Sequence, residues 1–294
     1  MAVQLESMAG LDLPQWEPGA FIEVKLPSGR VRHYSLCGDP RERDVYRIAV
    51  LREEHGRGGS KELHEMAGAG AVLEVRPPRN NFALEPAAEY LFLAGGVGIT
   101  PIVSMIRRAE QAAIPWRLVY GGRSRSWMAF ADELLSLGGD RVALFADDVE
   151  GRPDLAAEMA KVPPDGLVYA CGPAPMLDLV AGLSALRNAA QLRIERFSVA
   201  AVDIQGAPFH VELARTGVTV PVASNESILQ AMRARGIPTS FSCENGYCGT
   251  CEAVVLDGEP DQRDTYLTEE EKSDGFTMMI CVSRSAGPKL VLDL

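Results

Sequence analysis

Apolar and polar residues alternate with a period of two in the first part of the chain. The runs at residues 20–26, 31–37 and 45–52 show this alternation and are separated by turn-forming segments such as the Pro-Ser-Gly at 27–29. This period is typical of antiparallel strands with one buried face. The chain up to residue 87 is therefore expected to form a small β domain.

The pattern changes at residue 88, where short apolar runs alternate with segments of helical period. The runs are Tyr90–Ala94, Trp116–Tyr120, Arg141–Phe145, Leu167–Ala170 and Gln191–Glu195. Strands that alternate with helices predict a doubly wound parallel sheet with helices on both faces. We expect this α/β domain to cover residues 88–200.

Residues 208–294 return to alternating strands. The runs Phe209–Ala214 and Val218–Val222 flank a Thr-Gly turn, which is a hairpin signal. Residues 226–235 have helical period and end before Gly236. These elements predict a third, compact module.

The composition is that of a globular protein. The chain has 294 residues, 47% of them hydrophobic, and a net charge of −11, which disfavours a nucleic-acid binder. The N-terminus lacks the basic and apolar regions of a signal peptide, and glycines and Pro101 interrupt the most apolar stretch. We therefore expect no membrane segment and a cytoplasmic location, where cysteines stay reduced.

Four of the six cysteines form one pattern. Cys243, Cys248 and Cys251 have C-x4-C-x2-C spacing, and Cys281 follows after 29 residues. This is the plant-type spacing of a [2Fe–2S] cluster held by four thiolates, and glycines between the ligands let the backbone wrap closely. With the strands and helix around it, the loop predicts a β-grasp ferredoxin domain over residues 208–294.

A structural zinc site is the alternative, because it can also use four thiolates. Zinc sites usually have two closely spaced pairs, and Cys281 has no nearby mate, which favours the cluster. A Rieske centre needs two histidine ligands, and none of the four histidines lies in the cysteine loop. Cys37 and Cys171 stand apart and are not expected to be ligands.

Two glycine turns are expected at one edge of the parallel sheet. The first strand runs into residues 95–98, after which Thr100 is expected to cap a helix that begins at Pro101. The strand at 167–170 runs into Cys171–Pro173. Such turns before a helix N-terminus can bind a pyrophosphate, although a glycine turn can also serve close packing alone.

The front domain contains two candidate binding segments. Residues 32–35 combine basic, aromatic and hydroxyl side chains on one strand, which suits an anionic aromatic ligand but also an ordinary surface strand. Residues 58–60, Gly-Gly-Ser, precede a short helix and form a candidate phosphate site.

The motifs RxYS, GGS, GGVGITP, CGP and C-x4-C-x2-C occur in this order along the chain. Together they resemble the phthalate dioxygenase reductase family, which includes vanillate demethylase reductases, over almost the whole sequence. The resemblance implies an antiparallel β-barrel domain that binds FMN at 1–87, an NAD domain at 88–200 and the ferredoxin domain at 208–294. Family members begin with one more strand before the region corresponding to Val3–Leu11, so the first barrel strand is in question here.

The resemblance also implies a role for each motif. The FMN site would consist of Arg32, His33, Tyr34, Ser35, Ala49, Val50, Gly58, Gly59 and Ser60. The dinucleotide would lie against Gly95, Gly96, Gly98, Thr100, Pro101, Gly172 and Pro173. Cys171 and Glu195 would tune the nicotinamide pocket, and Phe197 would cover the flavin face.

The choice of nicotinamide depends on the end of the second sheet strand. The resemblance implies NADH, yet Arg123, Ser124 and Arg125 follow this strand with no acidic residue before Asp132. An acidic side chain there would accept the ribose hydroxyl of NAD, whereas an arginine can accommodate the extra phosphate of NADP. NADPH therefore stays open.

These cofactors together predict an electron-transfer enzyme. A nicotinamide releases two electrons as a hydride and a [2Fe–2S] cluster accepts one, so a flavin must lie between them. We expect the reductase component of a two-component Rieske-type oxygenase, an aromatic-acid dioxygenase or O-demethylase. Alternatives are a reductase for a di-iron or haem oxygenase, a non-catalytic redox sensor and a zinc-stabilised scaffold.

The last module is expected to dock the oxygenase through its charge. Residues 208–294 carry 13 acidic and 7 basic side chains, and much of this charge lies in Asp257, Glu259, Asp261, Asp264 and residues 269–271. Such a charge imbalance can steer association with a basic partner. A merely solvated acidic surface is the alternative.

Overall fold

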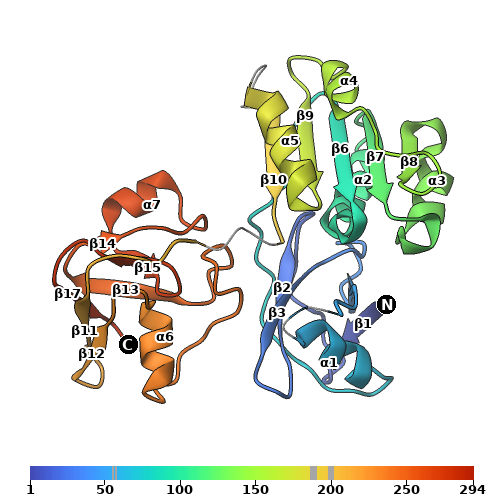
Figure 1. Cartoon of the computed structure of the whole chain (residues 1–294). Coiled ribbons are helices and arrows are strands. Elements are labelled where there is room, and N and C mark those ends of the chain that lie inside the picture. The colour runs from blue at the N-terminus through green and yellow to red at the C-terminus, as the bar shows by residue number, and fades with distance from the viewer. Residues whose placement is uncertain (55, 57, 186–190, 198–201) are drawn as a thin grey trace. The chain divides into compact units, whose positions relative to one another are not determined.

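The structure of the chain, a computed structural model, describes residues 1–54, 56, 58–185, 191–197 and 202–294 (Figure 1). It divides into two compact units, Met1–Phe197 and Ser198–Leu294. The finer boundaries expected at residues 87/88 and 200/208 stay predictions, and residue 200 lies outside the described residues. No helix in the described part of the chain is long and apolar enough to cross a membrane.

The first unit begins with antiparallel strands around one apolar core. The strands are β1 (Ala2–Glu6), β2 (Phe21–Lys25), β3 (Val31–Ser35), β4 (Val45–Ala49) and β5 (Glu74–Val75). β1 pairs with β4, β2 lies between β3 and β5, and a bridge from Leu36 to Ile48 connects the two sheets. The helix α1 (Gly59–Met66) buries Leu63 in this core. The antiparallel β fold is confirmed. β1 lies at the start of the region corresponding to Val3–Leu11, so it is not the additional strand that family members have before that region.

A parallel sheet with helices on both faces forms the rest of this unit (Figure 1). Its strands are β6 (Tyr90–Gly95), β7 (Trp116–Gly122), β8 (Val142–Ala146), β9 (Leu167–Cys171) and β10 (Leu192–Glu195). Its helices are α2 (Ile99–Gln111), α3 (Ala131–Gly138), α4 (Leu155–Ala160) and α5 (Ala174–Ala185), with 3-10 turns at Gly96–Gly98, Arg125–Trp127 and Gly139–Arg141. The doubly wound fold is confirmed.

The strand order of the sheet defines where a ligand can bind. The order is β10-β9-β6-β7-β8, so the chain leaves β6 toward β7 and later returns to its other side as β9. The cores on the two faces contain residues of α2 and α3 on one side and of α4 and α5 on the other. In open α/β sheets, ligands bind at the carboxyl ends of the strands where the winding reverses. Here that place lies between the ends of β6 and β9.

The start of α2 differs from the expectation. The 3-10 turn at Gly96–Gly98 continues directly into the helix, whose N-cap position is Gly98. Thr100 is therefore not the cap and Pro101 is not the first helical residue. The Thr100 hydroxyl donates to the Val97 carbonyl at 3.0 Å. No side chain in the described part of the chain caps the helix, and the N–H of its first residue, Ile99, donates to the Gly96 and Val97 carbonyl oxygens of the turn.

The second unit is a mixed sheet with one helix across it. Its strands are β11 (Phe209–Leu213), β12 (Val218–Val222), β13 (Glu252–Asp257), β14 (Pro260–Asp261), β15 (Thr277–Met279), β16 (Arg284–Ser285) and β17 (Lys289–Leu292). The main sheet has the order β12-β11-β17-β13-β15, with β11 parallel to β17. The helix α6 (Ile228–Ala234) begins with a capping box, as does α7 (Glu269–Asp274). This is the expected β-grasp fold.

Candidate functional site

The four predicted cluster ligands come together in the second unit. Cys243, Cys248, Cys251 and Cys281 are all buried. The thiol of Cys248 lies within hydrogen-bonding reach of Cys243, and the thiol of Cys281 lies within reach of Cys243 and Cys251. The backbone N–H of Asn245 donates to the Cys243 sulfur at 3.3 Å. N–H bonds to sulfur of this kind tune the potential of an iron–sulfur cluster.

The loop between these ligands wraps too closely for side chains at two positions. Gly246 and Gly249 have φ values of 72° and 75°. A Cβ on Gly246 would lie 2.6 Å from a Val282 methyl group, and one on Gly249 would lie 2.4 Å from the Tyr266 ring. Both the left-handed backbone and the lack of space require glycine.

The contacts between the thiols fit a cluster of two irons. In such a cluster each iron takes two of the four cysteine sulfurs. Across the described residues, no group of three or more His, Cys, Asp or Glu side chains is arranged to hold one metal ion. The pairwise contacts among buried thiols and the close glycine backbone are the features that a [2Fe–2S] cluster needs.

The two predicted glycine turns meet where the winding of the parallel sheet reverses. A Cβ on Gly98 would lie 2.3 Å from the Cys171 carbonyl oxygen and 2.7 Å from the Gly172 nitrogen. A Cβ on Gly95 would lie 2.4 Å from the Pro173 ring. The ends of β6 and β9 therefore pack backbone against backbone. Close packing is therefore one reason for these glycines, and it brings the turn before α2 next to the turn before α5.

Gly96 shows that the β6 turn also has an open side. Its φ is 55°, and no described atom lies within 4 Å of where its Cβ would be. The Tyr120 hydroxyl donates to the Gly96 carbonyl at 3.1 Å and holds the turn in place. A helix start without a side-chain cap and the open backbone at Gly96 suit a pyrophosphate.

Cys171 and Glu195 form a buried pair beside these turns. They are opposite each other in the register of β9 and β10, and the Cys171 sulfur lies 3.9 Å from Glu195 Oε2. Burial raises the pKa of the Glu195 carboxyl to about 8. Burial, and then the neighbouring Glu195, raise the pKa of the Cys171 thiol as well. Near neutral pH the pair is therefore mainly uncharged, and the Cys171 thiol is the donor toward Glu195 Oε2.

Glu195→Gln is expected to make stability less dependent on pH. The folded-state pKa of about 8 exceeds the ordinary value of 4.5, so the Glu195 proton stabilises the fold fully below pH 4.5. This stabilisation is lost as the pH rises through 8. Thermal midpoints at several values between pH 6 and 9 should thus fall more in the wild type than in the variant. Parallel curves would contradict the assignment, and the exposed Glu42→Gln is the control.

The region that selects the nicotinamide contains an acid that the sequence did not reveal. Arg123 and Arg125 are exposed, and Arg125 pairs with Glu150 at 3.1 Å. The other Glu150 oxygen accepts the Ala146 N–H at 2.9 Å, at the end of the strand next to β7. The Ser124 hydroxyl lies 3.0 Å from the neighbouring Ser126 hydroxyl, and the Ser124 carbonyl accepts the Trp127 N–H at 3.0 Å. A carboxylate therefore lies near the end of β7, but it comes from the loop after β8.

The candidate phosphate site joins β3 to the start of α1. A Cβ on Gly59 would lie 2.4 Å from Arg32 Nε, so the arginine side chain lies directly against the first residue of the helix. Gly58 occupies the N-cap position with a φ of 85°, a conformation that favours glycine. A guanidinium group beside a helix N-terminus is a good site for a phosphate. The Ser60 hydroxyl already accepts the Glu53 N–H at 3.0 Å.

Two buried hydroxyl groups on β3 have no hydrogen-bond partner among the described residues, Tyr34 Oη on the Arg32 side of the strand and Ser35 Oγ on the His33 side. Burial raises the pKa of the Tyr34 phenol to about 12. A buried hydroxyl without a partner is costly, so these groups fit a ligand with polar atoms, such as a flavin.

The other expected flavin residues have different surroundings. His33 lies on the opposite side of β3 from Arg32 and Tyr34, because side chains alternate along a strand. Its ring stacks on Phe21 at 4.9 Å, and its Nε2 lies 3.8 Å from a carboxylate oxygen of the buried Glu23. Burial, and then Arg79, lower the pKa of His33 to about 4. The structure thus does not bring His33 to the candidate phosphate site.

Three more residues were expected to contact the flavin, namely Ala49, Val50 and Phe197. Ala49 ends β4 and lies opposite Ala2 of β1. Val50 is buried in the core of the β-strand part, and its carbonyl oxygen lies 2.9 Å from His64 Nε2. Phe197, two residues after Glu195, has an exposed side chain (38%). An exposed aromatic ring at this position leaves its predicted role as a flavin cover open.

Two family models match the parts of the chain that carry these sites. "2Fe-2S iron-sulfur cluster binding domain" matches residues 211–286, and "Oxidoreductase NAD-binding domain" matches residues 92–182. The first range contains all four clustered cysteines, and the second contains both glycine turns. The cluster is thereby favoured over zinc.

Known proteins match the whole chain. "Phenoxybenzoate dioxygenase subunit beta" of Ectopseudomonas oleovorans is 45% identical over 285 residues, which cover 96% of this chain and 89% of that protein. The structure of phthalate dioxygenase reductase, described as modular for electron transfer from pyridine nucleotides to [2Fe–2S], has a TM-score of 0.73 and 36% identity. That match covers 100% of this chain and 92% of the other.

A haem enzyme also contains a similar part. An intact type IV self-sufficient cytochrome P450 monooxygenase matches with a TM-score of 0.87 and 41% identity over 100% of this chain. The chain spans only 39% of that enzyme. The same arrangement thus occurs both as a separate reductase and as part of a longer oxygenase.

Proposed function

The chain belongs to the phthalate dioxygenase reductase family, and we propose that it is the reductase component of a two-component Rieske-type oxygenase acting on an aromatic acid. It is an oxidoreductase with an NAD-binding domain and a [2Fe–2S] domain. The observation that carries the proposal is the presence of a two-turn nucleotide site and four gathered, buried thiols in a single chain. The named relatives that match over full length support an oxygenase as the acceptor.

The residues of each site have a binding and positioning role. The turns at Gly95–Gly98 and Cys171–Pro173 would hold the dinucleotide, with Glu195 beside the nicotinamide ring as a proton-bearing neighbour. Hydride transfer needs close approach and orientation rather than a general acid or base. A flavin held by Arg32, Gly58 and Gly59 would supply the conversion between two-electron chemistry at the nicotinamide and one-electron chemistry at the cluster. The plant-type potential of about −400 mV lies below the roughly −150 to +300 mV of Rieske centres, so electrons run downhill to such an acceptor.

We propose FMN as the flavin, because the front domain has one phosphate site, at Arg32, Gly58 and Gly59. Charge-assisted hydrogen bonds contribute about 1.5–3 kcal/mol, so Arg32→Ala should weaken flavin binding by about 10- to 100-fold. Fluorescence titration of the flavin-free protein measures this change. Lys25→Ala is the control, because it removes an exposed cation at the end of β2 that pairs with Glu74 of β5.

The identity of the flavin has its own test. Flavin released by heat is compared with FMN and FAD standards on a column. FMN is the expected result, and FAD would contradict the single phosphate site. If Arg32→Ala bound its flavin as tightly as the wild type, the flavin phosphate would have to bind at another site.

NADH is the proposed nicotinamide. The pairing of Arg125 with Glu150 neutralises one of the two cations that could bind the extra phosphate of NADPH. The specificity constant kcat/KM for flavin reduction should be higher with NADH. Equal or better kcat/KM with NADPH would overturn this proposal, and Arg125→Asp should then impair NADPH selectively.

The acceptor can be tested against the haem alternative. The similarity to part of a self-sufficient P450 favours a haem monooxygenase as the second candidate. Purified protein is mixed with a Rieske-type oxygenase component and its aromatic acid, or with a P450 haem domain and its substrate. NADH consumption coupled to product in the first mixture supports the proposal, whereas coupling only in the second would replace it.

The acidic docking face needs a narrower definition than the sequence indicated. Asp264 is buried, and its Oδ2 accepts the N–H groups of Tyr266 and Leu267 at 3.1 and 2.8 Å. Asp261 pairs with Arg263. The exposed acids of this set are Asp257, Glu259, Glu269, Glu270 and Glu271, which we call the acidic face. Among them Glu269 pairs with Lys272 at 3.0 Å.

We propose that the acidic face steers the oxygenase toward the second unit. Glu271 caps α7 through Thr268, and glutamine also serves in this capping box, so changing residues 269–271 together to Gln preserves the helix start. The triple variant should slow acceptor reduction severalfold at low salt, as added salt does by screening over roughly 10 Å at 0.1 M. Stopped-flow reduction of the oxygenase measures both effects. Glu212→Gln on β11 is the control. If neither salt nor the triple variant changed the rate of oxygenase reduction, the acidic face would not be the docking surface.

The proposal places the protein in the cytoplasm. The cluster needs four cysteines as free thiolates, and the cytoplasm keeps thiols reduced. All six cysteines are free in the structure.

A further inference from the structure

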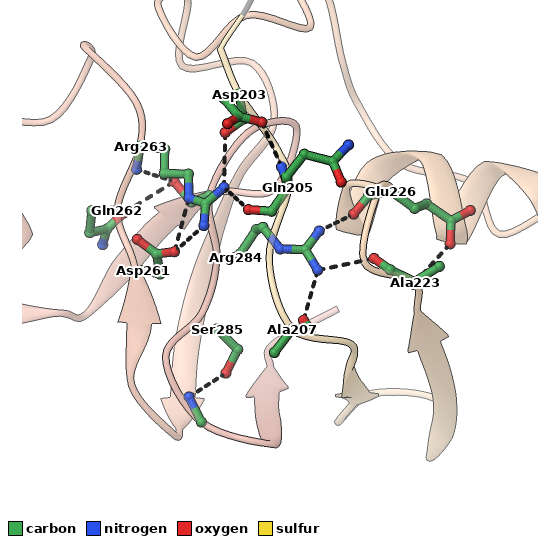
Figure 2. A network of polar contacts seen from close by, with 12 residues as sticks. Asp203, Gln205, Ala207, Ala223, Glu226, Asp261, Gln262, Arg263, Arg284 and Ser285 are labelled. Atoms are coloured by element: carbon green, nitrogen blue, oxygen red, sulfur yellow. Dashed lines mark hydrogen bonds and ion pairs between the residues drawn. The ribbon is translucent and has the colours of Figure 1, made fainter.

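The segment that leads into β11 is held by two arginines of the second unit (Figure 2). Arg263 Nη1 donates to the carbonyl oxygens of Asp203 and Gln205, each at 2.8 Å. Arg284 Nη2 donates to the Ala207 carbonyl oxygen at 2.9 Å. The acceptors are main-chain groups of alternate residues, so the two guanidinium groups bind the extended backbone itself.

Both arginines are anchored within their own unit. The Asp261 carboxylate accepts from Nε and Nη2 of Arg263 at 2.9 and 2.5 Å. Arg284 is almost fully buried (1% exposed) and lies 5.0 Å from the centre of the Phe209 ring. It also donates to the Ala223 carbonyl oxygen at 3.0 Å. Burying a guanidinium group costs free energy unless hydrogen bonds replace those to water. The Ala207 and Ala223 carbonyl oxygens supply such bonds, so the buried Arg284 holds the segment in place.

Further contacts bind the same segment. Gly206 lies between the two arginines, and a Cβ there would approach Arg284 Nε to 2.8 Å. Its N–H donates to the Ser224 carbonyl at 2.9 Å. Val202 and Ile204 pack against the core of the second unit. Residues 202–207 have no regular secondary structure, yet they are built into this unit.

We propose that Arg263 and Arg284 set the length of the covalent tether between the two units and thereby the rate of electron transfer from flavin to cluster. With residues 202–207 bound, four residues (198–201) separate Phe197 from Val202. With that segment released, ten residues (198–207) separate Phe197 from Pro208. The kinetic part of this inference rests on the proposed electron path.

The size of the effect follows from tether length. The effective concentration of one tethered partner at the other falls roughly as the −3/2 power of length once the tether exceeds the span it must bridge. Lengthening the tether from four to ten residues therefore predicts about a fourfold slower flavin-to-cluster transfer. Reduction of the flavin by NADH takes place within the first unit and should not change.

The test variant is Arg263→Ala, which removes two of the three clamped carbonyl contacts from a partly exposed side chain. Hydrogen exchange of residues 202–208, measured by mass spectrometry, should become faster in the variant. Gly206 and Ala207 stay bound to Ser224 and Arg284 in this variant, so the tether grows to eight residues (198–205). Anaerobic stopped flow should show normal flavin reduction by NADH and about threefold slower cluster reduction. Arg215→Ala is the matched control, because it removes an equal charge from the same unit, where Arg215 pairs with Asp293.

A second variant separates tether length from other effects of the substitution. Six Gly/Ser residues inserted between 201 and 202 of the wild type lengthen the tether without touching the arginines, and should reproduce the slowing. Cluster absorbance and the thermal midpoint of the second unit should stay unchanged in the insertion variant. Arg263→Lys, which keeps the charge but loses the forked donors, should give intermediate exchange.

Three results would overturn the inference. Unchanged hydrogen exchange in Arg263→Ala would show that the arginine does not hold the segment. Faster exchange with an unchanged rate of cluster reduction, in this variant and in the insertion variant, would show that tether length does not matter. If NADH fails to reduce the cluster of the wild type, the proposed function and the kinetic part fail together, while the exchange result still decides whether the clamp exists.

Discussion

Cys248→Ser is expected to abolish the EPR signal of the reduced cluster and to stop electron delivery to one-electron acceptors. Cys248 is buried and its thiol contacts Cys243, so its loss would remove one of the two cysteine ligands of one iron. Changes that only touch residues around metal ligands cost about 10- to 100-fold in affinity or activity, and loss of a ligand should exceed about 100-fold. Reduction of cytochrome c by NADH measures the loss.

The same variant should leave the first unit intact. NADH should bleach the flavin of Cys248→Ser at the wild-type rate, because the nucleotide and flavin sites lie in residues 1–197. Cys37→Ser is the matched control, since Cys37 is equally buried but belongs to the first unit, where its thiol donates to the Arg47 carbonyl. If Cys37→Ser or Cys171→Ser removed the cluster signal, or Cys248→Ser kept it, the ligand assignment would be wrong.

Gly98→Ala is expected to have the second large effect, on hydride transfer. The new methyl group would lie 2.3 Å from the Cys171 carbonyl oxygen and 2.7 Å from the Gly172 nitrogen. Both neighbours are backbone atoms, so the ends of β6 and β9 must separate. A displacement of about 1 Å at a reacting centre can cost 100-fold in rate, and we expect flavin reduction by NADH to slow by about 10- to 100-fold.

The strain of this substitution should also appear in stability. Overpacking costs about 1–3 kcal/mol, which lowers the thermal midpoint of the first unit by several degrees. Gly182→Ala is the control, because Gly182 lies within α5 and no described atom lies within 4 Å of the added methyl group. Helical glycine to alanine should be neutral or mildly stabilising. A normal rate of flavin reduction in Gly98→Ala would show that this turn is not part of the nucleotide site.

The parts of the fold that repeat a simple period were predictable from the sequence. The strands of the parallel sheet begin and end within one or two residues of their apolar runs, because burial on both faces leaves a continuous apolar signature. The cysteine spacing predicted a gathered set because short spacings constrain the loop whatever the rest of the fold does. The glycines at 95, 98 and 172 signalled close backbone approach, and that approach is present.

Some of the features that escaped prediction depend on partners distant in the sequence, and others depend on local backbone geometry. Glu150 reaches the end of β7 from the loop after β8, so no spacing after β7 could reveal it. Asp264 looked like surface charge but is buried, because two backbone N–H groups three residues or fewer away satisfy it. Arg284 is 77 residues from its Ala207 acceptor. The start of α2 was misplaced because a 3-10 turn at Gly96–Gly98 took the position expected for a side-chain cap.

The central claim is that electrons pass from NADH through the flavin to the [2Fe–2S] cluster of this chain. Its most direct test mixes the anaerobic protein with NADH in a rapid freeze-quench apparatus and follows flavin absorbance and cluster EPR over time. The account predicts that the flavin is bleached first, that the reduced-cluster signal follows, and that protein stripped of flavin shows no cluster reduction. A cluster that stays oxidised after flavin reduction, or one that NADH reduces equally fast without flavin, would contradict it.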